Sequence, residues 1–393
     1  MSSAILVLNA GSSSVKFALY DQRPLTPLLR GAIDGIGNSA RVDASGPCAA
    51  ALLAADALPQ AGSHEVCTQW LLDAIRERLP KITLQAAGHR VVHGGATFSA
   101  PTRIDDTVLR QLEALTPLAP NHQPANLAAI RAVTAIWPEL PQIACFDTSF
   151  HRSQPRLAQL FALPRELIDA GIVRYGFHGL SYEYLSGILP DFVGDRANAR
   201  VVIAHLGHGA SMCALREGRS IATTMGFTTL DGLMMGSRCG ALDAGVVLYL
   251  LREKKMSVDQ VDRMLNKQSG LLGVSTISDD VRELEASSDA RAAEALQLFA
   301  YRAARELGSL VAALGGLDVL VFSAGIGEHS ASTRQRICRY LQWLGVALDP
   351  VANAQHATRI SAESSALDVL VIPTNEELVI ARAAQTMGLA QSA

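Results

Sequence analysis

One strand–turn–strand pattern occurs twice in the chain, and this repeat limits the fold more than any other feature of the sequence. The copies lie at 5–19 and 201–215, and each has an apolar run, a Gly-rich turn and a second apolar run. Gly11 of the first copy takes the place of Gly207 in the second. Chance similarity of two hairpins is the alternative. We therefore expect one domain in two copies, with the active site in a cleft between them.

A second and weaker repeat, of a strand-like run and the two residues after it, occurs in the same order along the chain. The run 143–146 with its following Asp147-Thr148 resembles the run 319–322 with Ser323-Ala324. Because strand-like runs alternate with helical patterns, the fold class is predicted as α/β. We expect domains at 1–149 and 150–375, the first completed by a C-terminal helix at 376–390. The other helices are predicted at 66–79, 106–115, 126–136, 242–255, 290–314 and 333–344.

The composition excludes several classes of protein. The chain has 393 residues, 34 Lys and Arg against 37 Asp and Glu, a net charge of −3, and 49% hydrophobic residues. Such a chain can bury a full core, so bulk disorder is excluded, and it lacks the basic excess that nucleic-acid binding requires. No apolar run approaches the roughly 18–20 residues of a membrane span, and no signal segment is visible. We expect a cytoplasmic protein with reduced cysteines and no membrane or nucleic-acid partner.

Three Gly-rich segments are candidates for phosphate binding. Asn9–Ser14 offers backbone N–H groups and hydroxyls with Lys16 just beyond, and His205–Gly209 and Gly325–Glu328 are predicted as similar turns. Glycine lets the main chain approach an anion, and successive N–H groups form a concave donor set. Each segment taken singly is more often an ordinary turn. The P-loop and Rossmann fingerprints are both missing from the sequence.

Five polar side chains stand in surroundings that favour chemistry. Arg90 and Arg238 lie beside apolar or Gly-rich segments, and a guanidinium binds carboxylate or phosphate with two donors. His178 lies in a Gly-flanked turn at the predicted start of a helix. Asp147 follows a strand, where α/β ligands gather, with helix capping as the alternative. Glu376 opens a helix that Thr374 is expected to cap, so it either offsets the helix dipole or binds a metal.

Taken together, eight segments resemble the acetate kinase family, which belongs to the acetate and sugar kinase, heat-shock chaperone and actin superfamily. The segments are Asn9–Lys16, His89–Gly95, Phe146–Phe150, Arg174–Gly179, His205–Gly209, Gly232–Arg238, Ser323–Glu328 and Pro373–Leu378. The resemblance implies two duplicated α/β domains of the actin-like, ribonuclease H-like fold. It also implies a cytoplasmic homodimer that transfers phosphate directly and in line from ATP to acetate, reversibly. Mg²⁺ is the implied ion, with Mn²⁺ as the alternative, and ATP and ADP are the co-substrates.

The resemblance also implies a role for each matching residue. Asn9 and Glu376 would position the metal, and Arg90 would bind the carboxylate of the acid. The catalytic residues would be Asp147, His178 and Arg238. Those near the transferred phosphate or the acid would be Ser12, Ser14, Lys16, Val92 and Phe177. The nucleotide-contacting residues would be His205, Leu206, Gly207, His208, Gly209, Asp280, Val281, Arg282, Gly325, Ile326, Gly327, Glu328 and His329.

Several positions depart from the family pattern and keep alternatives open. His208 stands where Asn is usual, which puts nucleotide affinity in question, and Ala241 stands where Asp is usual, which puts the position of Arg238 in question. Asn121 replaces Leu and Thr229 replaces Pro at the expected acyl pocket, where an unpaired amide costs about 1–3 kcal/mol. One alternative is therefore a short-chain acyl kinase that prefers propionate or another small acid. A second is a non-catalytic, actin-like or chaperone-like ATP-binding protein.

Overall fold

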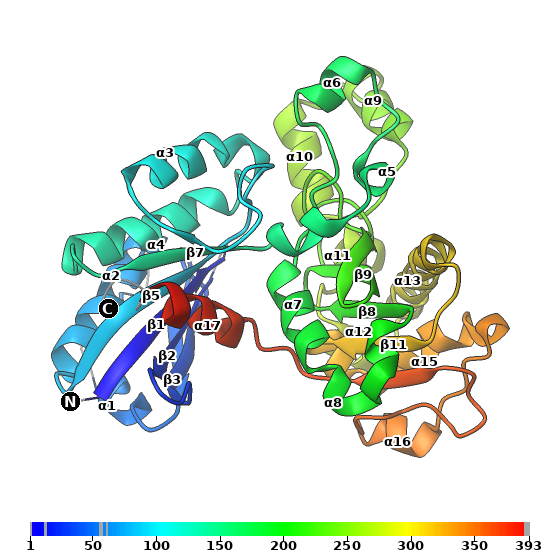
Figure 1. Cartoon of the computed structure of the whole chain (residues 1–393). Helices are drawn as coiled ribbons and strands as arrows, with labels where there is room; N and C mark the ends of the chain where they lie inside the picture. Colours follow the sequence, from blue (N-terminus) through cyan, green and yellow to red (C-terminus); the bar gives the residue numbers. More distant parts are fainter. Residues whose placement is uncertain (1, 12–13, 55–57, 60–61, 389–393) are drawn as a thin grey trace. The chain divides into compact units, whose positions relative to one another are not determined.

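The chain folds into two compact units. The computed structural model describes residues 2–11, 14–54, 58–59 and 62–388. The first unit comprises 1–150 with 375–393, and the second comprises 151–374. In Figure 1 the red C-terminal helix α17 (Glu376–Gly388) lies beside the blue strands of the first unit, with contacts to β1, β5 and β7. The first unit is thus built from both ends of the chain.

The first unit contains a seven-stranded sheet in the order β4-β3-β2-β1-β5-β7-β6. Its strands are β1 (Ser2–Ala10), β2 (Ser14–Asp21), β3 (Pro27–Asp34), β4 (Arg41–Ser45), β5 (Ile82–Val91), β6 (Thr102–Arg103) and β7 (Gln142–Phe146). Its other helices are α1 (Ala49–Leu53), α2 (His64–Arg78), α3 (Asp106–Ala114) and α4 (Gln123–Ile136). Helices therefore cover a sheet whose central strand β1 is buried over most of its length.

Neighbouring residues of β5 show how helices cover both faces of this sheet. Ala87 packs in the core cluster that includes Leu71 of α2 and Val133 of α4. The adjacent Gly88 faces α17, where a Cβ would lie only 2.5 Å from Cγ2 of Ile380. Successive residues of a strand point to opposite faces, so α17 covers the face away from α2 and α4. Glycine at 88 lets the C-terminal helix approach this closely.

The second unit contains a five-stranded sheet in the order β10-β9-β8-β11-β12. Its strands are β8 (Val201–Leu206), β9 (Ala210–Arg216), β10 (Arg219–Thr223), β11 (Val319–Ser323) and β12 (Asp368–Val371). The longest helix, α13 (Ala290–Leu314), has the predicted bounds and packs on β9. Its buried residues include Leu296, Phe299 and Leu307, at spacings typical of an amphipathic helix.

The two sheets share one topology, which confirms the duplicated α/β fold. In the first, β3, β2 and β1 pair antiparallel, and β5 and β7 continue the sheet parallel to β1. In the second, β10, β9 and β8 are antiparallel, and β11 and β12 continue parallel to β8. The second repeat, which matched 143–146 (β7) with 319–322 (β11), was wrong. By position in the sheet, β7 corresponds to β12 and β11 corresponds to β5. Short buried strands share the same apolar residues, so their likeness did not identify their place in the sheet.

Three local predictions need correction. Gly325–Glu328 is not a turn but lies in helix α14 (Ala324–His329). The helix predicted at 333–344 is α15 (Ala331–Arg339), which begins earlier because Ser330 accepts a hydrogen bond from the backbone N–H of Thr333. Helix α17 is capped by Asn375 rather than Thr374, since Asn375 Oδ1 accepts from the backbone N–H of Leu378 at 3.1 Å.

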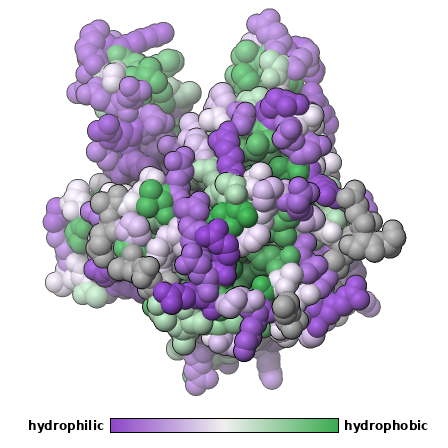
Figure 2. Space-filling model, turned by 90° about the vertical axis from the view of Figure 1, so that its left-hand side faces the viewer, coloured by the Kyte–Doolittle hydropathy of each residue, from purple (hydrophilic) through white to green (hydrophobic). Residues whose placement is uncertain are grey.

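Shorter helices complete the second unit. They are α5 (Arg156–Gln159), α6 (Arg165–Asp169), α7 (Gly179–Ile188), α8 (Pro190–Val193), α9 (Ala244–Arg252), α10 (Val258–Lys267), α11 (Gly270–Ser275), α12 (Val281–Ala286) and α16 (Pro350–Ala354). Across the described residues, none of the helices combines the length and apolarity that crossing a membrane requires. On the face shown in Figure 2, hydrophilic side chains cover most of the surface and hydrophobic ones form smaller areas between them.

Candidate active site

Three neighbouring strands of the first unit bring Asn9, Arg90 and Asp147 together. Arg90 lies near the end of β5, and Asp147 directly follows β7, its parallel neighbour. The guanidinium donates from Nε to Asp147 Oδ1 at 2.8 Å and from Nη2 to Oδ2 at 2.5 Å. Its Nη1 donates to Oδ1 of Asn9, on β1, at 3.0 Å. Asp147 is therefore not a helix cap but holds Arg90 in a fork, with Asp147 buried and Arg90 partly exposed.

Glu376, the first residue of α17, adds a second carboxylate to this group. Burial raises the pKa of Glu376 to about 7, and the charges of Asp147 and Glu377 also raise it. The cations Arg90 and Lys16 act in the opposite direction. Lys16 lies on β2 opposite Asn9 in the sheet register. Five residues from five separate segments thus form one charged cluster.

These residues fit a hard divalent cation such as Mg²⁺. A side-chain amide oxygen and carboxylates are oxygen ligands of the kind that Mg²⁺ prefers, and Asn9 and Glu376 supply one of each here. Within the part of the chain that the structure describes, no cluster of three or more His, Cys, Asp or Glu side chains forms a metal cage. Mg²⁺ is usually held by one or two carboxylates together with substrate phosphates, so such a cage is not required.

In the second unit, His178 and Arg238 converge beside the turn between β8 and β9. His178 precedes α7 with φ 60 and ψ 24, the left-handed conformation. Its ring stacks on that of His205, with centroids 4.2 Å apart and planes at 19°. A Cβ on Gly209 would lie 3.6 Å from both His178 Nε2 and Arg238 Nη2. Glycine at 209 therefore leaves open a space that two side-chain nitrogens face, and an oxyanion could be bound there where both nitrogens carry hydrogen.

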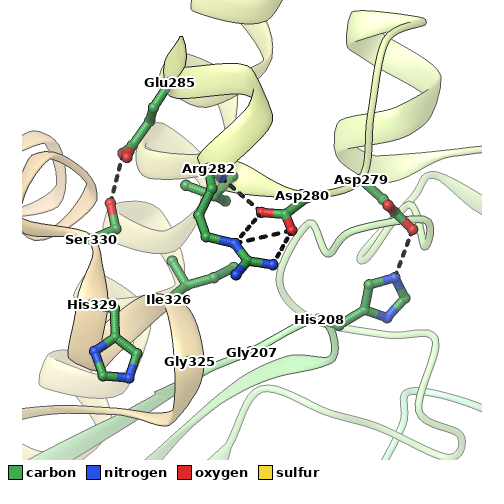
Figure 3. A pocket seen from close by; sticks show the side chains of 11 residues that line it. Gly207, His208, Asp279, Asp280, Arg282, Glu285, Gly325, Ile326, His329 and Ser330 are labelled. Carbon is green, nitrogen blue, oxygen red and sulfur yellow. Dashed lines mark hydrogen bonds and ion pairs between the residues drawn. The ribbon is translucent and has the colours of Figure 1, made fainter. Parts of the chain in front are cut away.

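A cavity of about 420 Å³ includes Gly207 and His208 of the same turn in its lining. Figure 3 shows the side chains that line it, and the full set is Gly207, His208, Asp279, Asp280, Val281, Arg282, Glu285, Gly325, Ile326, His329 and Ser330. Its volume lies within the roughly 300–1,000 Å³ of small-molecule sites. The three predicted nucleotide segments thus meet in one cavity.

An ion pair and a hydrogen bond order the edge of this cavity. Asp280 caps α12 and accepts from Arg282, with 2.5 Å between Asp280 Oδ2 and Arg282 Nη2. The hydrogen bond from Arg282 lowers the pKa of the Asp280 carboxyl. His208 Nε2 lies 2.9 Å from Oδ2 of Asp279, which the sequence did not single out. Both interactions are visible as dashed lines in Figure 3.

The remaining predicted site residues do not line this cavity. Among the described residues, the cavity lining does not include the predicted His205, Leu206, Gly209, Gly327 and Glu328. Ser12 lies outside the described residues, and Ser14 begins β2. Val92 and Phe177 are buried, one in each unit. Asn121 is exposed, and Thr229 is partly buried, with its carbonyl accepting from Arg238 Nη1 at 2.9 Å.

Sequence reasoning missed Ser211, which contacts the His178 ring, and Tyr182, which contacts Ser211. Ser211 Oγ lies 2.8 Å from His178 Nδ1, and the Tyr182 hydroxyl lies 2.5 Å from the same Ser211 Oγ. Tyr182 stands four residues after His178, one helical turn away, and Ser211 is opposite His205 in the hairpin register. Both spacings were visible in the sequence, but a buried Ser or Tyr is usually read as packing.

Comparisons with known proteins agree with this geometry. A model of the acetokinase family matches residues 4–382. The chain belongs to the acetokinase family. An acetate kinase of Rhodopseudomonas palustris (strain ATCC BAA-98 / CGA009) is 55% identical over 392 residues, covering 97% of this chain and 98% of its own.

Two solved structures are similar along almost their whole length. A propionate kinase from Francisella tularensis superimposes with a TM-score of 0.89 and 39% identity, covering 98% of this chain and 99% of that one. An acetate kinase from Porphyromonas gingivalis gives a TM-score of 0.86 and 33% identity, covering 98% and 100%. Acetokinase family members with either acid in their names thus share this fold.

Proposed function

We propose that this chain is an ATP:acetate phosphotransferase, which moves the terminal phosphoryl group of ATP directly to a carboxylate oxygen of acetate, reversibly. One observation carries the proposal. The turn between β8 and β9 lines the 420 Å³ cavity with Gly207 and His208, while its Gly209 faces His178 Nε2 and Arg238. A nucleotide whose base and ribose occupy the cavity can run its phosphates along this turn. Its terminal phosphate would then reach the two donors.

His178 and Arg238 have the chemistry that the transferred group requires. Phosphoryl transfer spreads negative charge over three oxygens, and catalysis consists mainly of positioning and neutralising that charge. A neutral imidazole N–H and a guanidinium supply hydrogen bonds and one positive charge without donating a covalent bond. Gly209 permits the phosphate to approach both, since a side chain there would occupy the same space.

The residues of the first unit suit the acid and the metal. Arg90 keeps a partly exposed guanidinium in a fixed plane through Asp147 and Asn9, which suits a small carboxylate. Asn9 and Glu376 would hold Mg²⁺, and Lys16 and Ser14 would bind phosphate oxygens. When bound, Mg²⁺ neutralises charge on the phosphate oxygens. Val92 and Phe177 would contact the methyl group of acetate.

A short-chain acyl kinase that prefers propionate is the second candidate. The Francisella tularensis propionate kinase, at 39% identity, favours it. Asn121 is exposed, so its amide needs no partner in an apolar pocket and favours neither acid. Acetate, propionate, butyrate and glycolate should be compared with ATP and Mg²⁺, trapping the acyl phosphate with hydroxylamine. A hundredfold preference for acetate in kcat/KM would exclude an altered pocket, whereas no acyl phosphate with any acid would refute phosphotransfer.

The two arginines give the sharpest test of the proposed roles. Arg90→Ala and Arg238→Ala should each remove most of the activity, because each deletes a charge that contacts substrate in the proposal. Circular dichroism should show both variants folded. Wild-type turnover in either variant would overturn the role of that arginine.

We also propose that the enzyme acts as a cytoplasmic homodimer. Helix α9 has no buried residues and exposes three large apolar side chains, Val246, Leu248 and Tyr249, each 40–51% accessible. Exposed apolar side chains that gather on a surface are common at protein interfaces. Light scattering of the purified protein should give the mass of two chains, and the mass of one chain at micromolar concentration would contradict the proposal.

A further inference from the structure

The stacked histidines of the second unit each contact a serine hydroxyl. His205 Nδ1 lies 2.8 Å from Ser181 Oγ, and Ser181 in turn donates to Thr374 Oγ1 at 2.9 Å. His178 Nδ1 lies 2.8 Å from Ser211 Oγ. Since the hydroxyl hydrogen of Ser181 goes to Thr374, Ser181 accepts from the N–H at Nδ1 of His205. His205 is therefore protonated at Nδ1, and the tautomer of His178 has to be worked out separately from the surroundings of Ser211.

The environment of Ser211 sets the tautomer of His178 in the opposite way. Ser211 and Tyr182 are both fully buried, and their oxygens lie 2.5 Å apart. The phenol is the stronger acid of the two hydroxyls, so Tyr182 donates to Ser211 Oγ. Ser211 then has its own hydrogen free to donate to Nδ1 of His178. Because Nδ1 accepts, the ring proton resides on Nε2.

The ring proton on Nε2 is where the proposed reaction needs it. Nε2 of His178 faces the space beside Gly209 that it shares with Arg238. With the proton on Nε2, the ring presents a hydrogen-bond donor to an oxyanion there. With the proton on Nδ1, it would present a lone pair to negative charge instead. One hydroxyl pair thus decides whether His178 attracts or repels the phosphoryl group.

Contacts from outside helix α7 orient the ring of His178. His178 adopts the left-handed conformation at the N-cap of α7, and its side chain makes no capping hydrogen bond. For a residue other than glycine this conformation costs roughly 1–2 kcal/mol. The ring is therefore oriented by Ser211 and by stacking on His205 rather than by its own helix.

We propose that Tyr182 and Ser211 form a hydroxyl relay that holds His178 in the Nε2–H tautomer, and that both act as positioning residues for phosphoryl transfer. The kinetic part of this inference rests on the proposed function, whereas the assignment of the tautomer does not. The relay begins and ends within the second unit, on helix α7 and strand β9.

The tautomer can be measured in the wild-type protein without substrate. Long-range ¹H–¹⁵N correlation spectra of ¹⁵N-histidine-labelled protein distinguish protonated from unprotonated ring nitrogens, and the His178→Asn spectrum identifies the resonances of His178. The relay predicts a protonated Nε2 and an unprotonated Nδ1. Protonation at Nδ1 with a bare Nε2 would overturn it, whether or not the protein makes acyl phosphate.

Kinetics of relay variants test the positioning role. Ser211→Ala should lower kcat by about 10- to 100-fold with little change in KM for ATP, as expected for an interaction made in the transition state. Tyr182→Phe should cost less, about 3- to 10-fold, because Ser211 keeps its own hydrogen. Tyr184→Phe removes a hydroxyl from the same helix outside the relay and is the matched control. Ser211→Thr keeps the hydroxyl and should therefore retain most of the activity that Ser211→Ala loses.

A double variant separates a relay from two independent packing effects. If Tyr182 acts through Ser211, Tyr182→Phe should have no further effect on kcat in the Ser211→Ala background. If the fold-losses in kcat of the two single variants multiply in the double variant, or if Tyr184→Phe loses as much kcat as Tyr182→Phe, the relay is refuted. If wild-type protein forms no acyl phosphate, the proposed function fails, and the spectra alone then decide whether the relay exists.

Discussion

Replacing Asp147 with Asn should weaken both phosphoryl transfer and the stability of the first unit. Asp147 accepts from Arg90 Nε and Nη2 through its two oxygens, at 2.8 and 2.5 Å. An amide offers one oxygen and one NH2 group, so one of the two contacts becomes donor against donor. The variant therefore keeps the shape of the pair and removes both its charge and half of its fork.

The expected size follows from the burial of the pair. Breaking a buried ion pair by removing one partner costs about 3–5 kcal/mol, because the remaining charge is left uncompensated. The side chain of Asp147 is only 2% exposed, but that of Arg90 is 17% exposed and still donates to Asn9. We therefore expect the lower end, about 3 kcal/mol. Activity should fall at least about 100-fold, since a displaced guanidinium no longer orients the acid.

A second Arg–Asp fork provides the control. Arg200 donates to Asp318 from Nε at 2.8 Å and from Nη2 at 2.7 Å, but these side chains are 38% and 26% exposed and lie outside the candidate site. Asp318→Asn makes the same chemical change in a solvated pair, so it should cost about 1 kcal/mol or less and leave activity unchanged.

The tryptophans make unfolding of the first unit measurable. Trp70 and Trp137 pack against its core, whereas Trp343 of the second unit is 68% exposed. Urea unfolding followed by tryptophan fluorescence therefore reports mainly on the first unit. Circular dichroism also follows the second unit, which holds the control residue Asp318, and hydroxylamine trapping reports acyl phosphate formation. Equal stability losses in Asp147→Asn and Asp318→Asn, or an Asp147→Asn rate within about threefold of wild type, would refute the reasoning.

Three further predictions concern other parts of the molecule. Arg334 is fully buried and donates to the backbone carbonyls of Gly327, Glu328 and Asn353. Arg334→Met leaves these carbonyls without a donor, so it should lower the free energy of unfolding in urea by about 3–5 kcal/mol and weaken ATP binding through α14. A loss of stability below about 1 kcal/mol would contradict this. The pKa of Glu376 rises from 4.5 to about 7, so the native state binds the proton more tightly in this range and the unfolding free energy should fall as pH rises through it. Glu376→Gln should remove that part of the slope, and an unchanged pH profile would disprove the shift. His208→Asn removes an exposed contact with Asp279, so the free energy of unfolding should change by less than about 0.5 kcal/mol. KM for ATP should change several-fold at constant kcat. A change in kcat alone would exclude a role for His208 in nucleotide binding.

Local pattern was enough to predict elements whose burial is regular. The helix at 290–314 was predicted to the residue, because its apolar stripe is long and its ends are set by Asp289 and Gly315. The hairpins around Gly11 and Gly207 were predicted because a turn between two apolar runs has a strong local signal. Gly325–Glu328 was misread as a turn, since its two glycines outweighed the weak signal of a six-residue helix.

The order of strands in the sheets could not be predicted in the same way. The strands β7 and β11 resemble each other in residues yet occupy different places in the two sheets. A buried strand needs only apolar residues on both faces, so its sequence carries little information about its neighbours. Pairing depends on hydrogen bonds between segments far apart in the chain, such as β1 with β5.

The sequence by itself determined the α/β class, the duplicated hairpin and the residue types suited to binding anions, because these depend on local periodicity and side-chain chemistry. Only the tertiary structure decided which groups act together. The structure shows that Asp147, which the sequence left as a possible helix cap, is the ion-pair partner of Arg90. It also shows that Ser211 contacts His178 and that Tyr182 contacts Ser211. Such contacts join side chains that are distant in sequence, and the pKa of Glu376 depends on burial and on charges from other segments. The chemical groups are encoded locally, whereas their protonation and orientation are set by the neighbours that folding supplies.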